Sequence, residues 1–237
     1  MVSLNEAFLV IGYIKLSTPI KLKALIFDVG DILYDASLWR KWLTSELNSN
    51  GIGISYDQLV EVWESFLVPV YKGNAEYWPQ FQAMLSQLGN SDLDGKQLEA
   101  AAREKGKLLA LQREPMPQVP ETLKDLKDRG VCLAALSDNE SGEQGIRKTL
   151  EQLGIEHCFD AVVSSCEIGH VKPEAKAFDY AIEKTGQAKA NCGFVAHDID
   201  ELSGAQRHSL FAIGYNYHPA APADCYIENF SELLEFV

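Results

Sequence analysis

A short apolar run that ends on an aspartate is the feature that most constrains the fold of this chain. Residues 23–27 are too few for a helix and lack the polar alternation of a strand with one wet face. Such a run is typical of a strand that is buried on both faces in a parallel sheet. It delivers Asp28 to the carboxyl end of the strand, where parallel sheets bind ligands. Asp28 is therefore a candidate nucleophile or metal ligand. The alternative is a capping or turn aspartate in the turn 29–31.

The rest of the chain divides into a helical part and a part in which helices and strands alternate. Residues 36–112 contain apolar stripes at helical spacing and no β-rich run, so we expect a helical domain inserted after the first strand. From Pro115 onward the pattern predicts a parallel sheet with crossover helices, which is an α/β fold. Further strands are expected at 131–136, 159–164, 192–196, 210–215 and 225–227, before a terminal helix through Leu233 and Leu234.

Local signals define some helix starts and leave other polar residues without a role. Ser55 with Gln58, and Ser141 with Gln144, have the spacing of helix N-terminal capping boxes. The aromatic stripes of the helical part are assigned to a bundle core. Four polar residues of that part could face a substrate but are assigned to solvated surface, namely Arg40, Lys41, Lys72 and Asn74.

Composition excludes several classes of partner. The net charge of -13 argues against nucleic acid or an anionic membrane, because phosphate backbones favour basic surfaces. The apolar run 8–14 is too short to cross a bilayer and is predicted to be an extra strand or an ordered arm. The five cysteines form no C-x-x-C pair, and Cys132 and Cys192 fall within expected core strands. We therefore expect reduced, structural cysteines and a cytoplasmic protein.

Polar side chains follow three of the expected strands. Asp28, Ser137 and the pair His197-Asp198 stand at strand ends, and Lys172 precedes a helix. Phosphoryl transfer to a carboxylate requires such a set, because a lysine and a divalent cation neutralise the transferring oxygens while a hydroxyl holds them. Taken singly, Ser137 could be a helix cap and Lys172 a solvated lysine.

Four segments resemble, in order, the four motifs of the haloacid dehalogenase-like hydrolase superfamily. They are Phe27-Asp-Val-Gly-Asp-Ile-Leu-Tyr-Asp35, Leu136-Ser-Asp-Asn139, Gly169-His-Val-Lys-Pro-Glu174 and Val195-Ala-His-Asp-Ile-Asp-Glu-Leu-Ser-Gly-Ala205. The resemblance implies a Rossmann-like core formed by 23–35 and 113–237, after an N-terminal extension 1–22. It also implies that 36–112 is the helical cap of subclass I and closes over the site to exclude water.

The resemblance also assigns roles to individual residues. It implies an aspartyl-enzyme intermediate on Asp28, assistance by Lys172, and a small phosphorylated metabolite as substrate. The phosphoryl group would be held by Ser137, Asp138 and Asn139. A divalent cation, Mg²⁺ or alternatively Mn²⁺ or another metal, would be held by Asp28, Gly30, His197, Asp198 and Glu201. A homodimer is a separate expectation, which the resemblance does not supply.

Three positions depart from the family pattern. Phosphatase members usually carry a second aspartate two residues after the nucleophile as general acid and base, and this chain has Gly30. Ile32 replaces a threonine, and His197 replaces a metal-binding carboxylate, although imidazole suits softer metals than Mg²⁺. Asp31 does not occupy the acid/base position. His197 could instead be a structural residue bonded to the backbone. The alternative to an active phosphatase is a catalytically impaired phosphate-binding or regulatory protein.

Overall fold

The computed structural model describes residues 21–89 and 94–237, and its centre is a six-stranded sheet. The strand order is β3-β2-β1-β4-β5-β6, and all neighbouring strands are parallel. The strands are β1 (Ala24–Phe27), β2 (Cys132–Ser137), β3 (Ala161–Ser164), β4 (Cys192–Ala196), β5 (Phe211–Tyr215) and β6 (Cys225–Ile227). The predicted α/β fold and its parallel sheet are confirmed. The expected N-terminal arm lies almost entirely outside the described residues.

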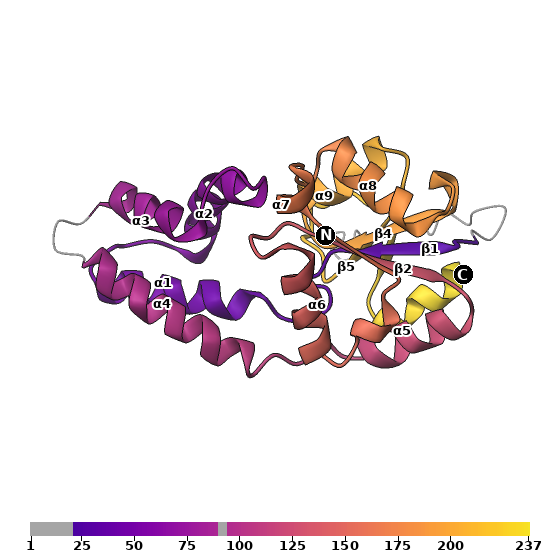
Figure 1. Cartoon of the computed structure of the whole chain (residues 1–237), viewed down its shortest axis with the longest axis horizontal. Coiled ribbons are helices and arrows are strands. Elements are labelled where there is room, and N and C mark those ends of the chain that lie inside the picture. The colour runs from indigo at the N-terminus through magenta and orange to yellow at the C-terminus, as the bar shows by residue number, and fades with distance from the viewer. Residues whose placement is uncertain (1–20, 90–93) are drawn as a thin grey trace, which may run out of the picture.

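Helices cover both faces of the sheet (Figure 1). One face carries α5 (Val119–Asp128), α6 (Gly142–Gln152) and the 3-10 helix η3 (Phe230–Phe236), and the other carries α8 (Ala175–Thr185) and α9 (Ile199–Arg207). Successive side chains of β1 alternate between the two hydrophobic clusters, and all are fully buried. This two-sided burial explains why the sequence of β1 shows no polar alternation.

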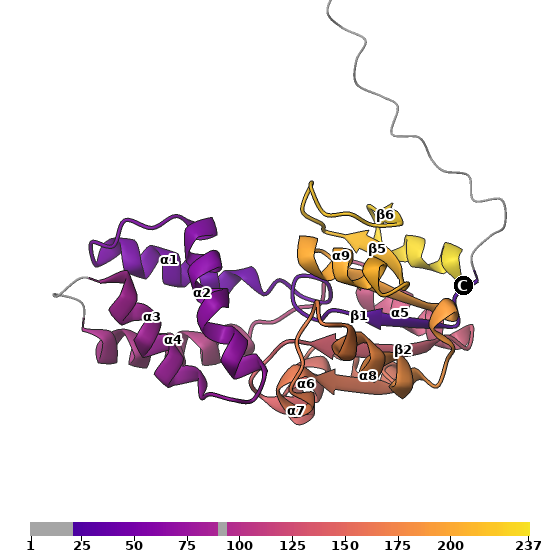
Figure 2. The ribbon, with the colours of Figure 1, turned by 90° about the horizontal axis from the view of Figure 1, so that it is seen from above.

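The inserted helices form a third hydrophobic cluster away from the sheet (Figures 1 and 2). They are α1 (Ser37–Ser49), α2 (Tyr56–Tyr71), α3 (Tyr77–Leu88) and α4 (Gly95–Ala110), and we call them the helical unit. Its aromatic side chains pack against one another, with the rings of Trp39 and Trp63 4.8 Å apart. The end of α2 contacts α7 (Ser165–Ile168) of the sheet-containing part. Across 21–89 and 94–237, no helix is both long enough and apolar enough to cross a membrane.

Local signals were correct at one predicted cap and wrong at another. The capping box of Ser55 and Gln58 is present at the start of α2. Ser141 precedes α6 but makes no side-chain cap bond, because its hydroxyl lies 3.3 Å from Oδ1 of Asn139 instead. The predicted terminal helix is present as the 3-10 helix η3.

Candidate active site

The candidate site lies where the strand order of the sheet reverses. From β1 the chain continues to β2 and β3 on one side and then returns to β4, β5 and β6 on the other. In open parallel sheets the crevice at such a switch point is the usual ligand site. Asp28 follows β1 directly, and its backbone N–H donates to the carbonyl of Val195 in β4 at 3.0 Å. The carboxylate therefore leaves the sheet at the reversal point.

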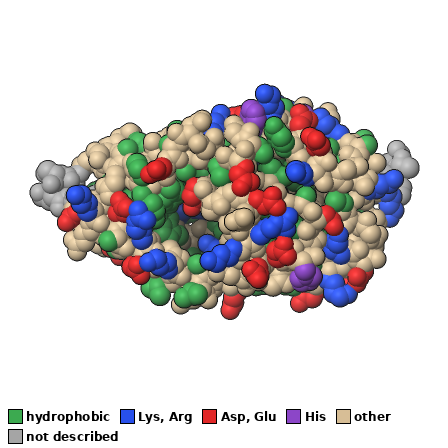
Figure 3. Space-filling view, in the orientation of Figure 1, with side chains coloured by type: hydrophobic (Ala, Val, Ile, Leu, Met, Phe, Trp, Pro, Cys, Tyr) green, Lys and Arg blue, Asp and Glu red, His purple; other side chains and the backbone are tan. Residues whose placement is uncertain are grey.

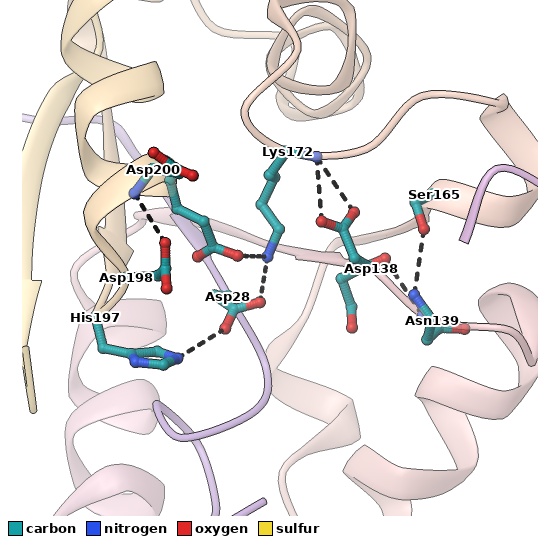
Figure 4. A network of polar contacts seen from close by, with 10 residues as sticks. Asp28, Asp138, Asn139, Ser165, Lys172, His197, Asp198 and Asp200 are labelled. Atoms are coloured by element: carbon teal, nitrogen blue, oxygen red, sulfur yellow. Dashed lines mark hydrogen bonds and ion pairs between the residues drawn. The ribbon is translucent and has the colours of Figure 1, made fainter. Parts of the chain in front are cut away.

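A buried ion-pair cluster is centred on Lys172 (Figure 4). The Nζ atom of Lys172 donates to Oδ1 of Asp28 and lies 2.8 Å from Oε1 of Glu201. The Lys172 side chain is 1% exposed, so the ammonium has exchanged water for these two carboxylates. Burial alone lowers the pKa of Lys172, but the charges of Asp28 and Glu201 outweigh burial and raise it. Lys172 is therefore a fixed positive charge beside Asp28.

Glu201 shares this cation and retains one unused oxygen. Burial, followed by the negative charge of Asp28, raises the pKa of Glu201 well above its usual value, although Lys172 opposes the shift. Among the described residues, its Oε2 atom is buried and has no hydrogen-bond partner. Burying a carboxylate oxygen without a hydrogen-bond partner costs free energy of folding, unless a proton or a ligand binds to that oxygen.

The loop after β2 supports the position of Lys172. The carboxylate of Asp138 accepts the backbone N–H of Lys172, with its two oxygens at 3.1 and 3.3 Å from that nitrogen. Burial, opposed by Lys172, raises the pKa of Asp138 to about 6. Asp138 thus contacts the lysine's backbone in this structure.

Asn139 and Ser137, the other two polar residues of the segment 136–139, differ in how many hydrogen bonds their side chains already make. The side chain of Asn139 is used within its own loop, because Oδ1 accepts the N–H of Ser141 at 2.9 Å. Its backbone N–H also donates to the Ser165 hydroxyl at 3.2 Å. The hydroxyl of Ser137, at the end of β2, has no hydrogen-bond partner within the described part of the chain. Ser137 is therefore the residue of this motif whose side chain remains available to a ligand.

The residues after β4 take two different positions. The ring of His197 points toward Asp28, with Nε2 4.0 Å from Oδ2 (Figure 4). The carboxylate of Asp198 caps α9 instead, since Oδ1 accepts the N–H of Asp200 at 2.8 Å. Of the two residues at this strand end, His197 lies against the candidate nucleophile.

We tested these positions for a divalent cation. Within 21–89 and 94–237, no group of three or more His, Cys, Asp and Glu side chains is arranged to hold a metal ion. Oδ2 of Asp28 and Nε2 of His197 nevertheless face each other, and Glu201 holds a buried oxygen that lacks a partner. Carboxylate oxygens and an imidazole nitrogen are donor types that divalent cations take in proteins. The imidazole makes the set softer than the oxygen ligands that Mg²⁺ prefers.

The positions after Asp28 offer no second acid. A Cβ atom added to Gly30 would lie 3.2 Å from Cβ of Ala36, so the turn is closely packed there. Asp31 is engaged elsewhere: its Oδ2 lies 2.5 Å from Nη2 of Arg40, and its Oδ1 accepts the N–H of Ala36 at 2.8 Å. Ile32 is fully buried in the hydrophobic core. Motif one therefore supplies a single carboxylate, Asp28, to the cluster around Lys172.

Two residues assigned to solvated surface from the sequence are instead paired with the sheet-containing part. Arg40 of α1 binds Asp31 and also donates from Nε to the hydroxyl of Tyr56 at 3.0 Å. Lys72, directly after α2, lies 2.5 Å from Oε1 of Glu174. The surface assignment was wrong for both, because helical periodicity does not reveal which polar face meets another part of the chain.

A further residue that sequence reasoning missed is Tyr71, at the end of α2. Burial raises its pKa, and the charges of Glu140 and Asp138 add to this effect. Its side chain therefore lies near the loop after β2.

In the space-filling view the surface is hollowed between the helical unit and the sheet-containing part, with hydrophobic side chains along the hollow (Figure 3).

Comparison with known proteins identifies a matching family and several similar proteins. A family model described as haloacid dehalogenase-like hydrolase matches residues 22–208. A glyceraldehyde 3-phosphate phosphatase of Methanopyrus kandleri is 30% identical over 200 residues, which are 81% of this chain and 83% of that protein. A phosphoglycolate phosphatase of Mannheimia succiniciproducens is 27% identical over 128 residues, covering 51% of this chain and 56% of that protein.

The fold is also similar to solved structures. The crystal structure of an HAD phosphatase from Thermococcus onnurineus matches with a TM-score of 0.61 and 22% identity, over 90% of this chain and 96% of that one. The family model over 22–208 and the relative from Methanopyrus lead to one assignment. The chain belongs to the haloacid dehalogenase-like hydrolase family.

Proposed function

We propose that this hydrolase is a phosphatase of a small phosphorylated metabolite that uses Asp28 as its nucleophile. The observation that carries the proposal is the bond from the Lys172 ammonium to Asp28 in a buried cluster at the switch point of the sheet. The named activities of the relatives from Methanopyrus and Mannheimia support a small phosphorylated molecule as the substrate class. The net charge of -13 argues against a nucleic acid substrate.

The proposed chemistry proceeds in two transfers. A carboxylate oxygen of Asp28 attacks phosphorus, an O–P bond forms, and the bond from phosphorus to the leaving oxygen breaks. Lys172 neutralises charge on the transferring oxygens, and the free hydroxyl of Ser137 donates to one of them. Water then attacks phosphorus, which releases phosphate and restores the Asp28 carboxylate. Residues 36–112, which we propose to be a cap domain, would exclude other water from the site.

A divalent cation is part of this proposal. Asp28, the Gly30 carbonyl and His197 would hold it, with Glu201 close by, and Asp198 would have to leave its capping bond to contribute. When bound, such a cation neutralises the phosphoryl oxygens and orients them for in-line attack. Mg²⁺ is the first candidate, and His197 is the reason to include Mn²⁺.

The leaving group receives no proton from motif one, because Gly30 stands where an acid would. General acid catalysis contributes about two to four orders of magnitude in rate. We therefore expect this chain to prefer aryl, acyl or anomeric phosphates, whose leaving oxygens need little protonation. A panel that compares phenyl, acetyl and alkyl phosphates tests this, and equal rates for alkyl and aryl esters would contradict it.

A second candidate function is a catalytically impaired phosphate-binding or regulatory protein, favoured by Gly30, Ile32 and His197 together. Addition of magnesium and beryllium fluoride discriminates the two, because the fluoride complex mimics a phosphoryl group on a carboxylate. An adduct on Asp28 together with substrate turnover supports the enzyme, whereas an adduct without turnover supports the binding protein.

The five cysteines are all free thiols, which is consistent with the cytoplasmic location that we propose.

A further inference from the structure

The end of α2 is joined to the loop that carries Lys172. Nζ of Lys72 lies 2.5 Å from Oε1 of Glu174, and Glu174 is the N-cap residue directly before α8. Glu174 stands two positions after Lys172 in the same motif. The helical unit therefore reaches the segment that positions the catalytic ammonium, although α2 is distant from that segment in the sequence.

Glu174 also makes two hydrogen-bond contacts within the loop 170–174, which carries Lys172. Its Oε2 atom lies 2.8 Å from Nδ1 of His170, and its backbone N–H donates to the carbonyl of Val171 at 2.8 Å. The hydrogen bond from Lys72 is the largest influence that lowers the pKa of Glu174, so the carboxylate stays charged. One carboxylate thus connects the two ends of the loop 170–174 and binds Lys72 of the helical unit.

The backbones approach closely beside this ion pair. Gly73, which follows Lys72, has a φ of +70°, and a Cβ added there would lie 2.5 Å from the carbonyl oxygen of Cys166 in α7. Only glycine fits both the left-handed conformation and the small gap. The turn after α2 therefore packs on α7 at Cys166, four positions before the loop 170–174 begins.

A second ion pair joins the helical unit to the other catalytic loop. Arg40 of α1 binds Asp31, which lies three positions after Asp28. Each of the two loops that provide the buried pair Lys172–Asp28 is therefore held by one cation of the helical unit. Contacts placed in this way make the geometry of the reacting groups depend on the position of the helical unit.

We propose that Lys72 is a positioning residue that couples docking of the helical unit to the placement of Lys172. The proposal rests on the function proposed above. The two side chains of the Lys72–Glu174 pair are 30% and 35% exposed. A half-exposed pair of this kind shifts an equilibrium by at most about fivefold, so this contact can open and close during each catalytic cycle. It orders the Lys172 loop when the helical unit is docked and releases it when the unit moves away.

Kinetics of three variants test the coupling. Lys72→Met removes the cation, Lys72→Arg keeps it, and Lys107→Met is the matched control, because Lys107 pairs with Glu104 inside α4 and does not reach the sheet-containing part. We expect Lys72→Met to lower kcat by about three- to fivefold with a smaller change in KM, because a pair of this exposure shifts the docking equilibrium by at most about fivefold. Lys72→Arg should restore most of kcat. Equal kcat for Lys72→Met and Lys107→Met would overturn the proposal.

Amide hydrogen exchange tests the same coupling without any substrate. In Lys72→Met and in Glu174→Gln, exchange in 169–174 should become faster, and the double variant should exchange no faster than the quicker single variant. Unchanged exchange in this segment would overturn the coupling. If no phosphate ester is hydrolysed by the wild-type protein, the proposed function fails, while the exchange result still decides whether Lys72 orders the loop.

Discussion

Nε2 of His197 lies 4.0 Å from Oδ2 of Asp28, whereas the other oxygen of that carboxylate is bonded to Lys172. Asp28 therefore stands between a permanent cation and an imidazole (Figure 4). Each oxygen of the Asp28 carboxylate therefore has a different neighbour. Oδ1 is bonded to the Lys172 ammonium, and Oδ2 faces His197, which stands where the family pattern has a metal-binding acid. The metal preference of the protein should depend on His197.

Replacement of His197 by the acid that the family pattern expects should strengthen Mg²⁺ binding. His197→Asp supplies a hard oxygen ligand beside Asp28, and Mg²⁺ prefers oxygen over imidazole nitrogen. We expect at least about tenfold tighter Mg²⁺ binding and a smaller advantage of Mn²⁺, measured by calorimetric titration and by the metal-induced rise in Tm. His197→Asn, which lacks the added charge, is the control. Mg²⁺ binding that is equal in wild type and His197→Asp would contradict this role.

Introduction of an acid at position 30 should broaden the range of leaving groups. Gly30→Asp restores a general acid, worth about two orders of magnitude or more on alkyl phosphates. The new Cβ meets Ala36 at 3.2 Å, so the double variant with Ala36→Gly should gain more than Gly30→Asp alone. The measurement is the ratio of alkyl to aryl phosphate kcat/KM. Gly30→Asn in the same background has nearly the same shape without the acid and should leave this ratio unchanged.

Removal of the central ammonium should destabilise the fold. Lys172→Met leaves Asp28 and Glu201 as neighbouring buried carboxyl groups without their cation. Loss of one partner from a buried ion pair costs about 3–5 kcal/mol in free energy of unfolding. Adding Glu201→Gln should recover part of this loss, because it removes one of the two charges. Urea unfolding of the metal-free proteins at pH 8 measures both values, and a Lys172→Met variant as stable as the wild type would refute the cluster.

The carboxyl group of Asp138 should make stability fall as the pH rises through mildly acidic values. Its pKa is raised to about 6 in the fold, mainly by burial, against about 3.9 in an unfolded chain. Between these values the folded state binds more protons than the unfolded state, so this group stabilises the fold at low pH and stops doing so above about pH 6. Asp138→Asn should remove this pH-dependent component, because an amide does not titrate. The variant should keep the contact with Lys172, because the amide oxygen can still accept its backbone N–H.

Unfolding in urea at several pH values between 4 and 7, with EDTA present, isolates that component. The difference in stability between Asp138→Asn and wild type should grow in favour of the variant as the pH rises. A difference that is independent of pH would show that Asp138 keeps its ordinary pKa in the fold.

Much of the sheet could be predicted because each of its strands is visible in the sequence as a short run of apolar residues. Leu25 and Phe27 face one hydrophobic cluster and Ala24 and Ile26 the other, so the run has no polar position. The strand-end position of Asp28 followed from the same pattern. Its bond to Lys172 joins residues 144 positions apart, and only the family's motif order brought them together before the fold was known.

The contacts of the helical unit could not be predicted in the same way. The amphipathic pattern of α1 and α2 shows which side packs inside the unit but not which polar residue meets another part of the chain. In the sequence Arg40 and Lys72 therefore look like ordinary surface residues, although they bind Asp31 and Glu174 in the sheet-containing part. Ser141 was misassigned for a related reason, because Asn139 competes for its hydroxyl.

The central claim is that Asp28 carries the phosphoryl group, and peptide mapping after rapid acid quench tests it most directly. The protein is mixed with excess aryl phosphate and its divalent metal, quenched during turnover, digested and examined by mass spectrometry. We predict one added phosphoryl group, sensitive to hydroxylamine, on the peptide that contains Asp28, and none in Asp28→Asn. Phosphorylation of a different peptide, or turnover by Asp28→Asn at the wild-type rate, would contradict the claim.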